Sequence, residues 1–278
     1  MVKTKYNRVI ANSFNFLSSQ PAWAFLCNFF LVMIVFSLSR IFFYIVNKSY
    51  FPGMDTTHLL NLFIGGLRFD LSALLYVNFF YMVMQLIPFH FRLNITYQKI
   101  ARWIFVITNG IALIINCVDV PFFRYTNRRT TASIFSEFSN ETGGSISKII
   151  LNATLEYWYV TIFAAVCIAA LWFFYRTPVK NSVTRRSGLV YFLSHIAVLV
   201  IIVYYSVICI RGGFGDYTRP ITVSDANKYV NNGTETAIVL NTPFCLIRTV
   251  HRKVYKIPEY FDNDATMTAL FSPLHNPA

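Results

Sequence analysis

The sequence has few charged residues and no cluster of cysteine or histidine. Only 13% of its 278 residues are Asp, Glu, Lys or Arg, about half the share of an average soluble domain. Its five cysteines form no CxxC pair and its five histidines no HxxxH or HExxH spacing, so neither a zinc site nor a disulfide framework is supported. GxSxG is absent, and Gly212, Gly213 and Gly215 lack the lysine of a phosphate-binding loop. The chain itself therefore shows no catalytic motif.

Apolar residues are abundant instead. They make up 55% of the sequence, 18% of it is aromatic, and the mean hydropathy is +0.49. A helix that crosses a bilayer core of about 30 Å needs about 20 mostly apolar residues. Five runs approach this length, at about 22–45, 71–89, 103–118, 158–175 and 189–210. We predict an all-α polytopic membrane protein in which residues 1–210 form a five-span domain and residues 211–278 a tail.

The distribution of lysine and arginine predicts the orientation of these spans. Segments 1–21, 90–102 and 176–188 together hold ten Lys or Arg and no Asp or Glu. The positive-inside rule then places the N-terminus in the cytoplasm, and five spans place the tail outside. Topology thus accounts for most of the net charge of +12. We expect anionic phospholipid headgroups as a partner and no nucleic acid.

The segment between the third and fourth predicted spans, about 119–157, is long for a simple connection. Arg124, Arg128 and Arg129 lie in it, on the side where the topology rule requires no positive charge. We treat them, with Arg211 and Arg219 at the start of the tail, as candidates for contact with an anionic headgroup. A solvated loop is the alternative interpretation of the cluster.

Several local features predict how the spans and the tail begin and end. Arg40 is expected to snorkel from the first span to the interface. The Gly65–Gly66 pair is expected to allow a turn into the second span. In the tail, Thr242 as N-cap and Pro243 at the next position predict a basic amphipathic helix that Pro258 stops. Such a helix lies on the membrane surface or packs against a following soluble domain.

Four segments carry a resemblance to a known family: GGLRFDLSALLYVN, CVDVPFFRYTNRRTTASIFSEF, RGGFGDYTRPITVSDANKYV and NTPFCLIRTVHRKVY. In this order they resemble the N-terminal membrane domain of the lipoteichoic acid synthase-like, sulfatase-related phosphotransferases of the alkaline phosphatase superfamily, especially those of Bacteroidetes. The motif positions that match are Arg68, Asp70, Asp119, Gly212, Gly213 and Pro220.

The resemblance implies a five-span anchor in the bacterial cytoplasmic membrane, followed by linker helices and an extracytoplasmic catalytic domain beyond Ala278. That domain would carry a threonine nucleophile and a divalent metal, usually manganese. It would transfer phosphoglycerol or a similar headgroup from a lipid, or hydrolyse a phosphate or sulfate ester. None of those motifs is in this sequence, so no catalytic residue, metal ligand or cofactor is assigned to it. The alternatives are a stand-alone small membrane protein, such as a transporter subunit or a scaffold, and a naturally truncated anchor.

Overall fold

The computed structural model describes residues 21–134, 152, 154–178, 188–213 and 219–250, and the regular secondary structure in these residues is helical throughout. Among them, four helices are long and apolar enough to cross a membrane. They are α2 (Pro21–Val46), α3 (Thr56–Val77), α5 (Ile95–Thr126) and α9 (Gly188–Arg211). A shorter apolar helix, α8, spans Trp158–Phe173. The predicted all-α, membrane-spanning fold is confirmed.

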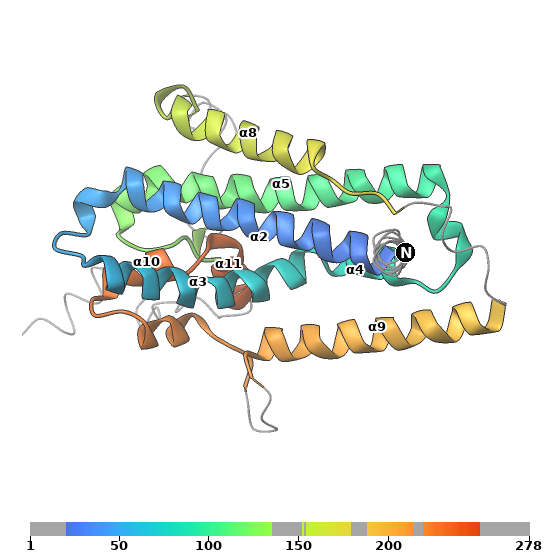
Figure 1. The fold of residues 1–278 in the computed structure, drawn as a ribbon. Coiled ribbons are helices and arrows are strands. Elements are labelled where there is room, and N and C mark those ends of the chain that lie inside the picture. Colours follow the sequence, from blue (N-terminus) through green and yellow to red (C-terminus); the bar gives the residue numbers. More distant parts are fainter. Residues whose placement is uncertain (1–20, 135–151, 153, 179–187, 214–218, 251–278) are drawn as a thin grey trace, which may run out of the picture.

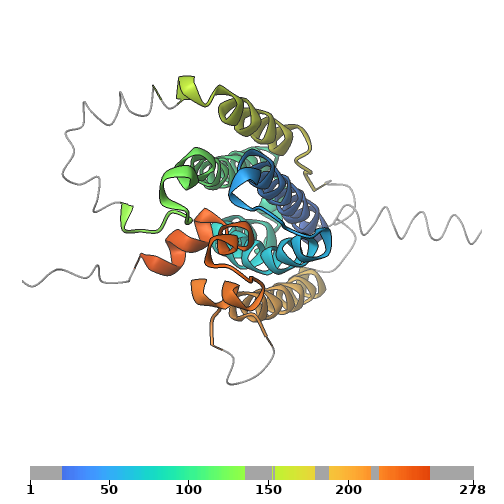
Figure 2. The ribbon, with the colours of Figure 1, turned by 90° about the vertical axis from the view of Figure 1, so that its left-hand side faces the viewer.

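The helices form an elongated bundle with α2, α3 and α5 at its centre (Figure 1). Helix α4 (Phe79–Leu86) continues α3, and the short η2 (His90–Leu93) leads into α5. Helix α8 packs along α5 and α9 along α3, so the two lie on opposite sides of the bundle (Figure 2). We call the end where α2 and α5 finish the collar end, and the end where they begin the basal end.

Four of the predicted spans coincide with single helices, whereas the second, 71–89, is divided at Asn78 between the end of α3 and α4. Two of the helices are longer than the apolar runs. Helix α3 begins at Thr56, and α5 extends from Ile95 to Thr126. The predicted turn at Gly65 and Gly66 is wrong, because α3 is continuous through both glycines. They permit close packing instead: a Cβ on Gly65 would lie 2.7 Å from the Tyr229 ring, and one on Gly66 would overlap the Arg40 guanidinium.

The junction of α3 and α4 is held by two buried asparagines. Asn78 interrupts the helix, and its Nδ2 donates to Asn109 Oδ1 at 2.8 Å and to the Leu74 carbonyl at 3.0 Å. Asn109 returns the first bond at 2.7 Å and also donates to the Phe105 carbonyl at 2.8 Å. Both amide groups are therefore satisfied within the bundle, as polar groups inside a bilayer must be.

The tail enters the collar end of the bundle. Its elements are two short 3-10 helices, η5 (Val223–Lys228) and η6 (Gly233–Glu235), and two short α-helices, α10 (Thr236–Val239) and α11 (Thr242–Thr249). Helices α10 and α11 pack against α3, and also contact α2 and α5 respectively. Residues Ala237 to Cys245 are all buried. The first half of α11 is thus enclosed by protein and does not lie on the membrane surface.

The start of α11 differs by one residue from the prediction. Asn241 is the N-cap, and its Oδ1 accepts from the Phe244 N–H at 2.8 Å. Thr242 and Pro243 therefore occupy the first and second helical positions, where a missing N–H is still harmless. Thr242 does not act as the cap because its hydroxyl has another partner, described below. The predicted stop at Pro258 lies outside the described residues.

Candidate functional site

A cluster of buried polar side chains joins the tail to the membrane helices at the collar end. Two carboxylates and two guanidiniums take part, and none of the four side chains is more than 4% exposed. Burying a charge is costly unless it is paired and hydrogen-bonded. We call the cluster the clasp; its members are Arg40, Asp70, Asp119, Arg129, Asn241 and Thr242.

One half of the clasp is centred on Asp70 of α3. Arg40 of α2 donates from Nη2 to Asp70 Oδ1 at 2.5 Å, and Asn241 Nδ2 donates to the same oxygen at 2.7 Å. Arg40 also donates to the carbonyls of Val239, at 2.5 Å, and of Ile238. These carbonyls end α10 and have no partner within that helix, so the guanidinium both satisfies them and complements the negative end of the helix dipole.

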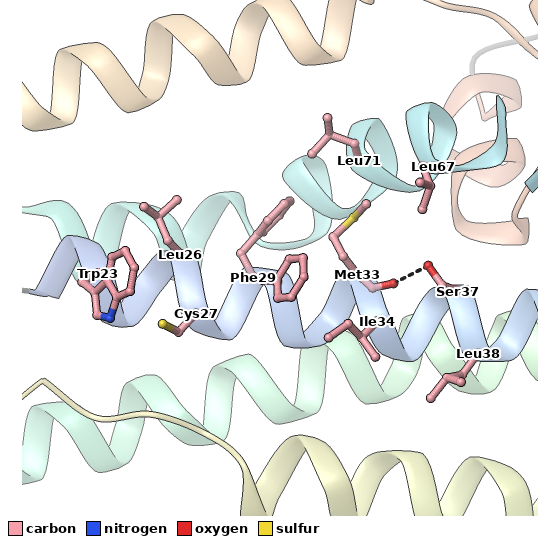
Figure 3. Close-up of a pocket in the computed structure, with 11 residues that line it drawn as sticks. Trp23, Leu26, Cys27, Phe29, Met33, Ile34, Ser37, Leu38, Leu67 and Leu71 are labelled. Carbon is pink, nitrogen blue, oxygen red and sulfur yellow. Dashed lines mark hydrogen bonds between the residues drawn. The ribbon is translucent and has the colours of Figure 1, made fainter. Parts of the chain in front are cut away.

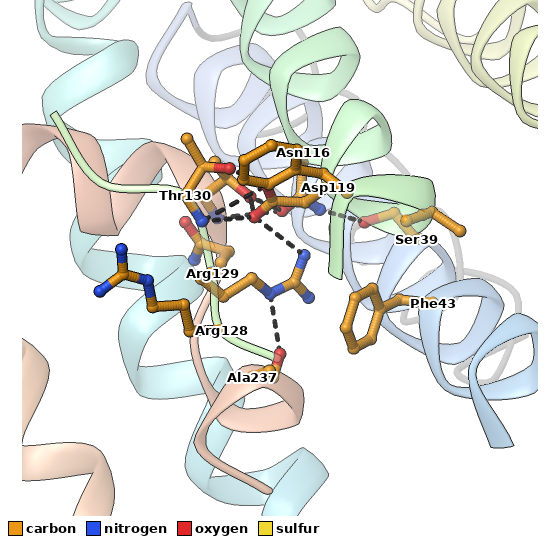
Figure 4. Close-up of polar contacts among 12 residues, drawn as sticks. Ser39, Phe43, Asn116, Asp119, Arg128, Arg129, Thr130 and Ala237 are labelled. Carbon is orange, nitrogen blue, oxygen red and sulfur yellow. Dashed lines mark hydrogen bonds and ion pairs between the residues drawn. The ribbon is translucent and has the colours of Figure 1, made fainter. Parts of the chain in front are cut away.

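The other half is centred on Asp119 of α5 (Figure 4). Its carboxylate accepts from Thr242 Oγ1 at 2.5 Å and from the N–H and hydroxyl of Thr130. Arg129 Nη1 lies 3.7 Å from Asp119 Oδ2, and its Nε donates to the Ala237 carbonyl at 2.8 Å. The Arg129 guanidinium also lies 3.8 Å from the centre of the Phe43 ring, a cation–π contact.

The electrostatics of Arg129 follow from this enclosure. Burial lowers the pKa of the guanidinium, Asp119 raises it, and the neighbouring Arg40 lowers it again. Arginine remains charged in proteins because its ordinary pKa is above 12. The charge on Arg129 is therefore retained and is balanced by protein groups, chiefly Asp119 and the α10 carbonyl.

The start of α11 is hydrogen-bonded directly to α3 and α5 and is linked through Asn116 to α2. Besides the contacts to α3 and α5, the Thr242 N–H donates to Asn116 Oδ1 of α5 at 3.1 Å. Asn116 Nδ2 in turn donates to Ser39 Oγ of α2 at 2.9 Å. Displacing the tail would therefore leave partners on α2, α3 and α5 unsatisfied at the same time.

A second contact between the tail and α3 lies nearer the surface. His58 Nε2 is 2.9 Å from Glu235 Oε2, and that oxygen also accepts from the main chain of Asn231 at 2.8 Å. Desolvation raises the pKa of Glu235, but the hydrogen bonds from His58, Asn231 and Asn232 outweigh it, and the pKa is lowered overall. Glu235 is therefore ionised at neutral pH and fixes the turn before α10.

The start of the tail is fixed at the end of α9. Gly212 adopts a φ of +79°, which is unfavourable for other residues. Its carbonyl accepts from Arg68 of α3, while Arg248 of α11 donates to the Ile210 carbonyl at 3.4 Å. Gly212 thus ends α9 in a left-handed conformation, and two arginines bind the carbonyls at this helix end.

The candidate headgroup residues are now divided into two groups. Arg124, Arg128 and Arg219 are exposed, as is Pro220. Arg129 points into the protein, whereas Arg128, its neighbour, points away from Asp119 (Figure 4). Arg211 is half-buried and engaged in interactions. Arg129 therefore serves the clasp, and the exposed arginines are the ones free to meet a headgroup.

The sequence indicated Asp70 and Asp119 as two separate motif positions. In the structure, the tail binds both of them. Arg40, Asn116 and Asn241 were missed as members of this site. Arg40 does not snorkel to the interface, because Asp70 and the α10 carbonyls bind it within the bundle. The sequence did carry a signal for Arg40: a single arginine inside a 26-residue apolar helix requires a partner within the protein.

The clasp joins parts of the protein to one another. Each of its charged groups already contacts protein, and no cluster of three or more metal-ligating side chains occurs among the residues that the structure describes. Burial raises the pKa of Cys245, beside the clasp, to about 12, so this thiol is not a nucleophile at neutral pH. Comparison of the chain with models of protein families, with curated proteins and with solved structures finds no match in any of the three.

Proposed function

We propose that the chain is a membrane anchor and positioning domain that presents the polypeptide beyond α11 in a fixed orientation at the membrane surface. The observation that supports this proposal is the attachment of neighbouring tail residues, Asn241 and Thr242, to carboxylates on two different membrane helices. A flexible tether needs no such attachment. Removing one member of a buried ion pair typically costs about 3–5 kcal/mol, so a clasp of this kind resists rotation of the tail.

The enzyme to which the anchor belongs is, in this proposal, a lipoteichoic acid synthase-like phosphotransferase or hydrolase of the sulfatase family. The resemblance of four segments supports this part, and two of its motif residues, Asp70 and Asp119, lie at the clasp. The catalytic threonine and the manganese would belong to the following domain. Its substrate would be phosphoglycerol or a similar lipid headgroup, or a phosphate or sulfate ester, at the outer face of the bacterial cytoplasmic membrane.

The position of the anchor has a kinetic purpose in this proposal. Holding a catalytic domain at the surface where its lipid substrate lies raises the effective concentration of that substrate. The exposed Arg124, Arg128 and Arg219 would contact anionic headgroups near the collar end. Their contribution would weaken with salt, because exposed charges are screened over about 8–10 Å at physiological ionic strength.

The test is the apparent mass of the native product in membranes of the source cells, detected with an antibody against residues 219–250. A species much larger than 32.1 kDa that also releases phosphoglycerol from phosphatidylglycerol, or hydrolyses a phosphate or sulfate ester, would support the proposal. A species at 32.1 kDa would contradict it. The stand-alone scaffold or transporter subunit would then be the better interpretation.

A further inference from the structure

A long apolar groove runs along the outside of the bundle between α2 and α3 (Figure 3). Its volume is about 820 Å³. The walls are the face of α2 from Trp23 to Leu38 together with Leu67 and Leu71 of α3. The one hydroxyl in the lining, that of Ser37, already donates to the Met33 carbonyl at 2.9 Å. The groove therefore offers little to a polar ligand.

The shape of the groove matches a hydrocarbon chain held straight. At 1.5 Å per residue, the stretch of α2 from Trp23 to Leu38 is about 22 Å long. One leaflet of the hydrocarbon core is about 15 Å thick. A single extended acyl chain entering from one surface could thus lie along most of the groove.

A second helix is a poorer occupant. Helices that pack closely in membranes meet through small residues such as Gly, Ala and Ser, which let the backbones approach. Apart from Ser37 and Cys27, the lining consists of large side chains, among them Trp23, Phe30 and Met33. A helix about 10 Å wide would rest on these side chains without filling the space between them.

The basal end of the groove combines an interfacial tryptophan with positive charge. Trp23 lies near the basal end, where tryptophan is favoured at the interface. The exposed charged residues described at that end are Lys99, in the first turns of α5, and Arg176, and the described residues 87–94 and 174–178 include no Asp or Glu. Arg176 is exposed, and Asn28 of α2 binds its main chain at 2.7 and 2.9 Å. An anionic headgroup at this end would meet positive charge.

We propose that the groove binds one acyl chain of an anionic phospholipid whose headgroup lies at the basal end. The site is distinct from the proposed positioning function, because its lining faces the outside of the bundle, whereas the nearby Arg40 and Asp70 are buried inside it. Its partner is recognised by two complementary features: an apolar channel for the chain and a basic surface for the phosphate. Ordinary boundary lipid would use neither feature selectively.

The first test uses tryptophan fluorescence of the full chain in bilayers that contain lipid brominated on its acyl chains. In one variant Trp23 is the sole tryptophan, because the other three are replaced by Trp103→Phe, Trp158→Phe and Trp172→Phe. Its control keeps only Trp158, which is 62% exposed on α8. We expect brominated phosphatidylglycerol to quench Trp23 at mole fractions that leave Trp158 nearly unquenched, and brominated phosphatidylcholine to lack this selectivity. Equal quenching of the two tryptophans would mean boundary lipid only and would overturn the proposal.

The second test fills the groove. Ser37→Phe places a ring in it, whereas Ile111→Phe adds a ring to an exposed position of α5. We expect native mass spectrometry to find one phosphatidylglycerol retained by the unaltered chain and by Ile111→Phe, and loss of that lipid from Ser37→Phe. Retention by all three proteins would exclude the groove as the site. Efficient cross-linking of Cys27 between two copies would show a protein occupant instead and would equally overturn the proposal.

Discussion

Asn241 and Thr242 are neighbours in the chain, yet their side chains bind carboxylates on different membrane helices, Asp70 on α3 and Asp119 on α5. Their backbones are extended at Asn241 and helical from Thr242, so the two side chains diverge at the start of α11. One dipeptide therefore fixes both the position and the rotation of this helix. This relationship leads to the first prediction.

Replacing Asp70 with Asn should detach the tail. The change leaves the Arg40 guanidinium buried without a countercharge, for which we expect a loss of about 3–5 kcal/mol. Thermal unfolding in detergent measures the stability, and hydrogen exchange of residues 236–249 reports the detachment. Asp55→Asn, an exposed position at the start of α3, is the control. Unchanged exchange in the tail of Asp70→Asn would contradict the assigned role of the clasp.

Thr242 allows a finer test of the other half. Thr242→Val removes the hydroxyl that donates to Asp119 and leaves a buried acceptor less satisfied, at a cost of about 1–3 kcal/mol. Thr242→Ser keeps the hydroxyl and should recover most of that stability. If the serine variant behaved like the valine variant, lost packing and not the hydrogen bond would explain the effect.

The glycines of the membrane helices offer a matched pair of substitutions. Gly66→Ala would force its Cβ onto the Arg40 guanidinium, so we expect strong destabilisation and disturbed tail docking. Gly110→Ala in α5 would meet only Ile168 at 3.8 Å, an ordinary contact, and should be tolerated. Equal melting temperatures for the two variants would show that Arg40 can move aside.

The surface contacts of the tail predict a dependence on pH. The pKa of Glu235 is lowered in the folded chain and that of Asp225 is lowered to about 2. A lowered carboxyl pKa contributes stability above its ordinary value of about 4, and this stability is lost as the pH falls toward the folded value. We expect tail docking to weaken between about pH 4.5 and 2. Glu235→Gln combined with Asp225→Asn should remove most of that dependence, measured as the unfolding midpoint against pH.

Replacing the exposed Arg124 and Arg128 should have a different effect from replacing the buried Arg129. Arg124→Gln with Arg128→Gln should weaken association with anionic vesicles, and the loss should be greatest at low salt, without a change in the melting temperature. Arg129→Gln should instead lower the melting temperature, because Asp119 loses its countercharge and the Ala237 carbonyl loses its donor. Vesicle flotation and thermal unfolding of these two variants and of the unaltered chain distinguish the two effects.

The fold was largely predictable because apolar runs of sufficient length allow only helices in a membrane. The site was less so. The apolar periodicity of α11 shows that one face is buried, but not whether lipid or protein covers it. The functions of Gly66 and Arg40 emerge only when α2 and α3 are packed together. Asp70 and Asp119 were identified as motif positions, but their separation by 48 intervening residues conceals that one dipeptide binds them both.

The contacts of Arg40 also form in a fixed order, because its partners are translated at different times. Its ion-pair partner Asp70 follows 30 residues later, whereas the Ile238 carbonyl follows 198 residues later. At translation rates of about 5–20 residues per second, the second interval lasts about 10–40 s. During biosynthesis the growing chain must therefore hold this guanidinium with groups of α3, Asp70 and the Gly66 carbonyl, before the tail is made. It follows that the Arg40–Asp70 ion pair joins α2 and α3 first, and that the tail completes the site only after translation of its own helices.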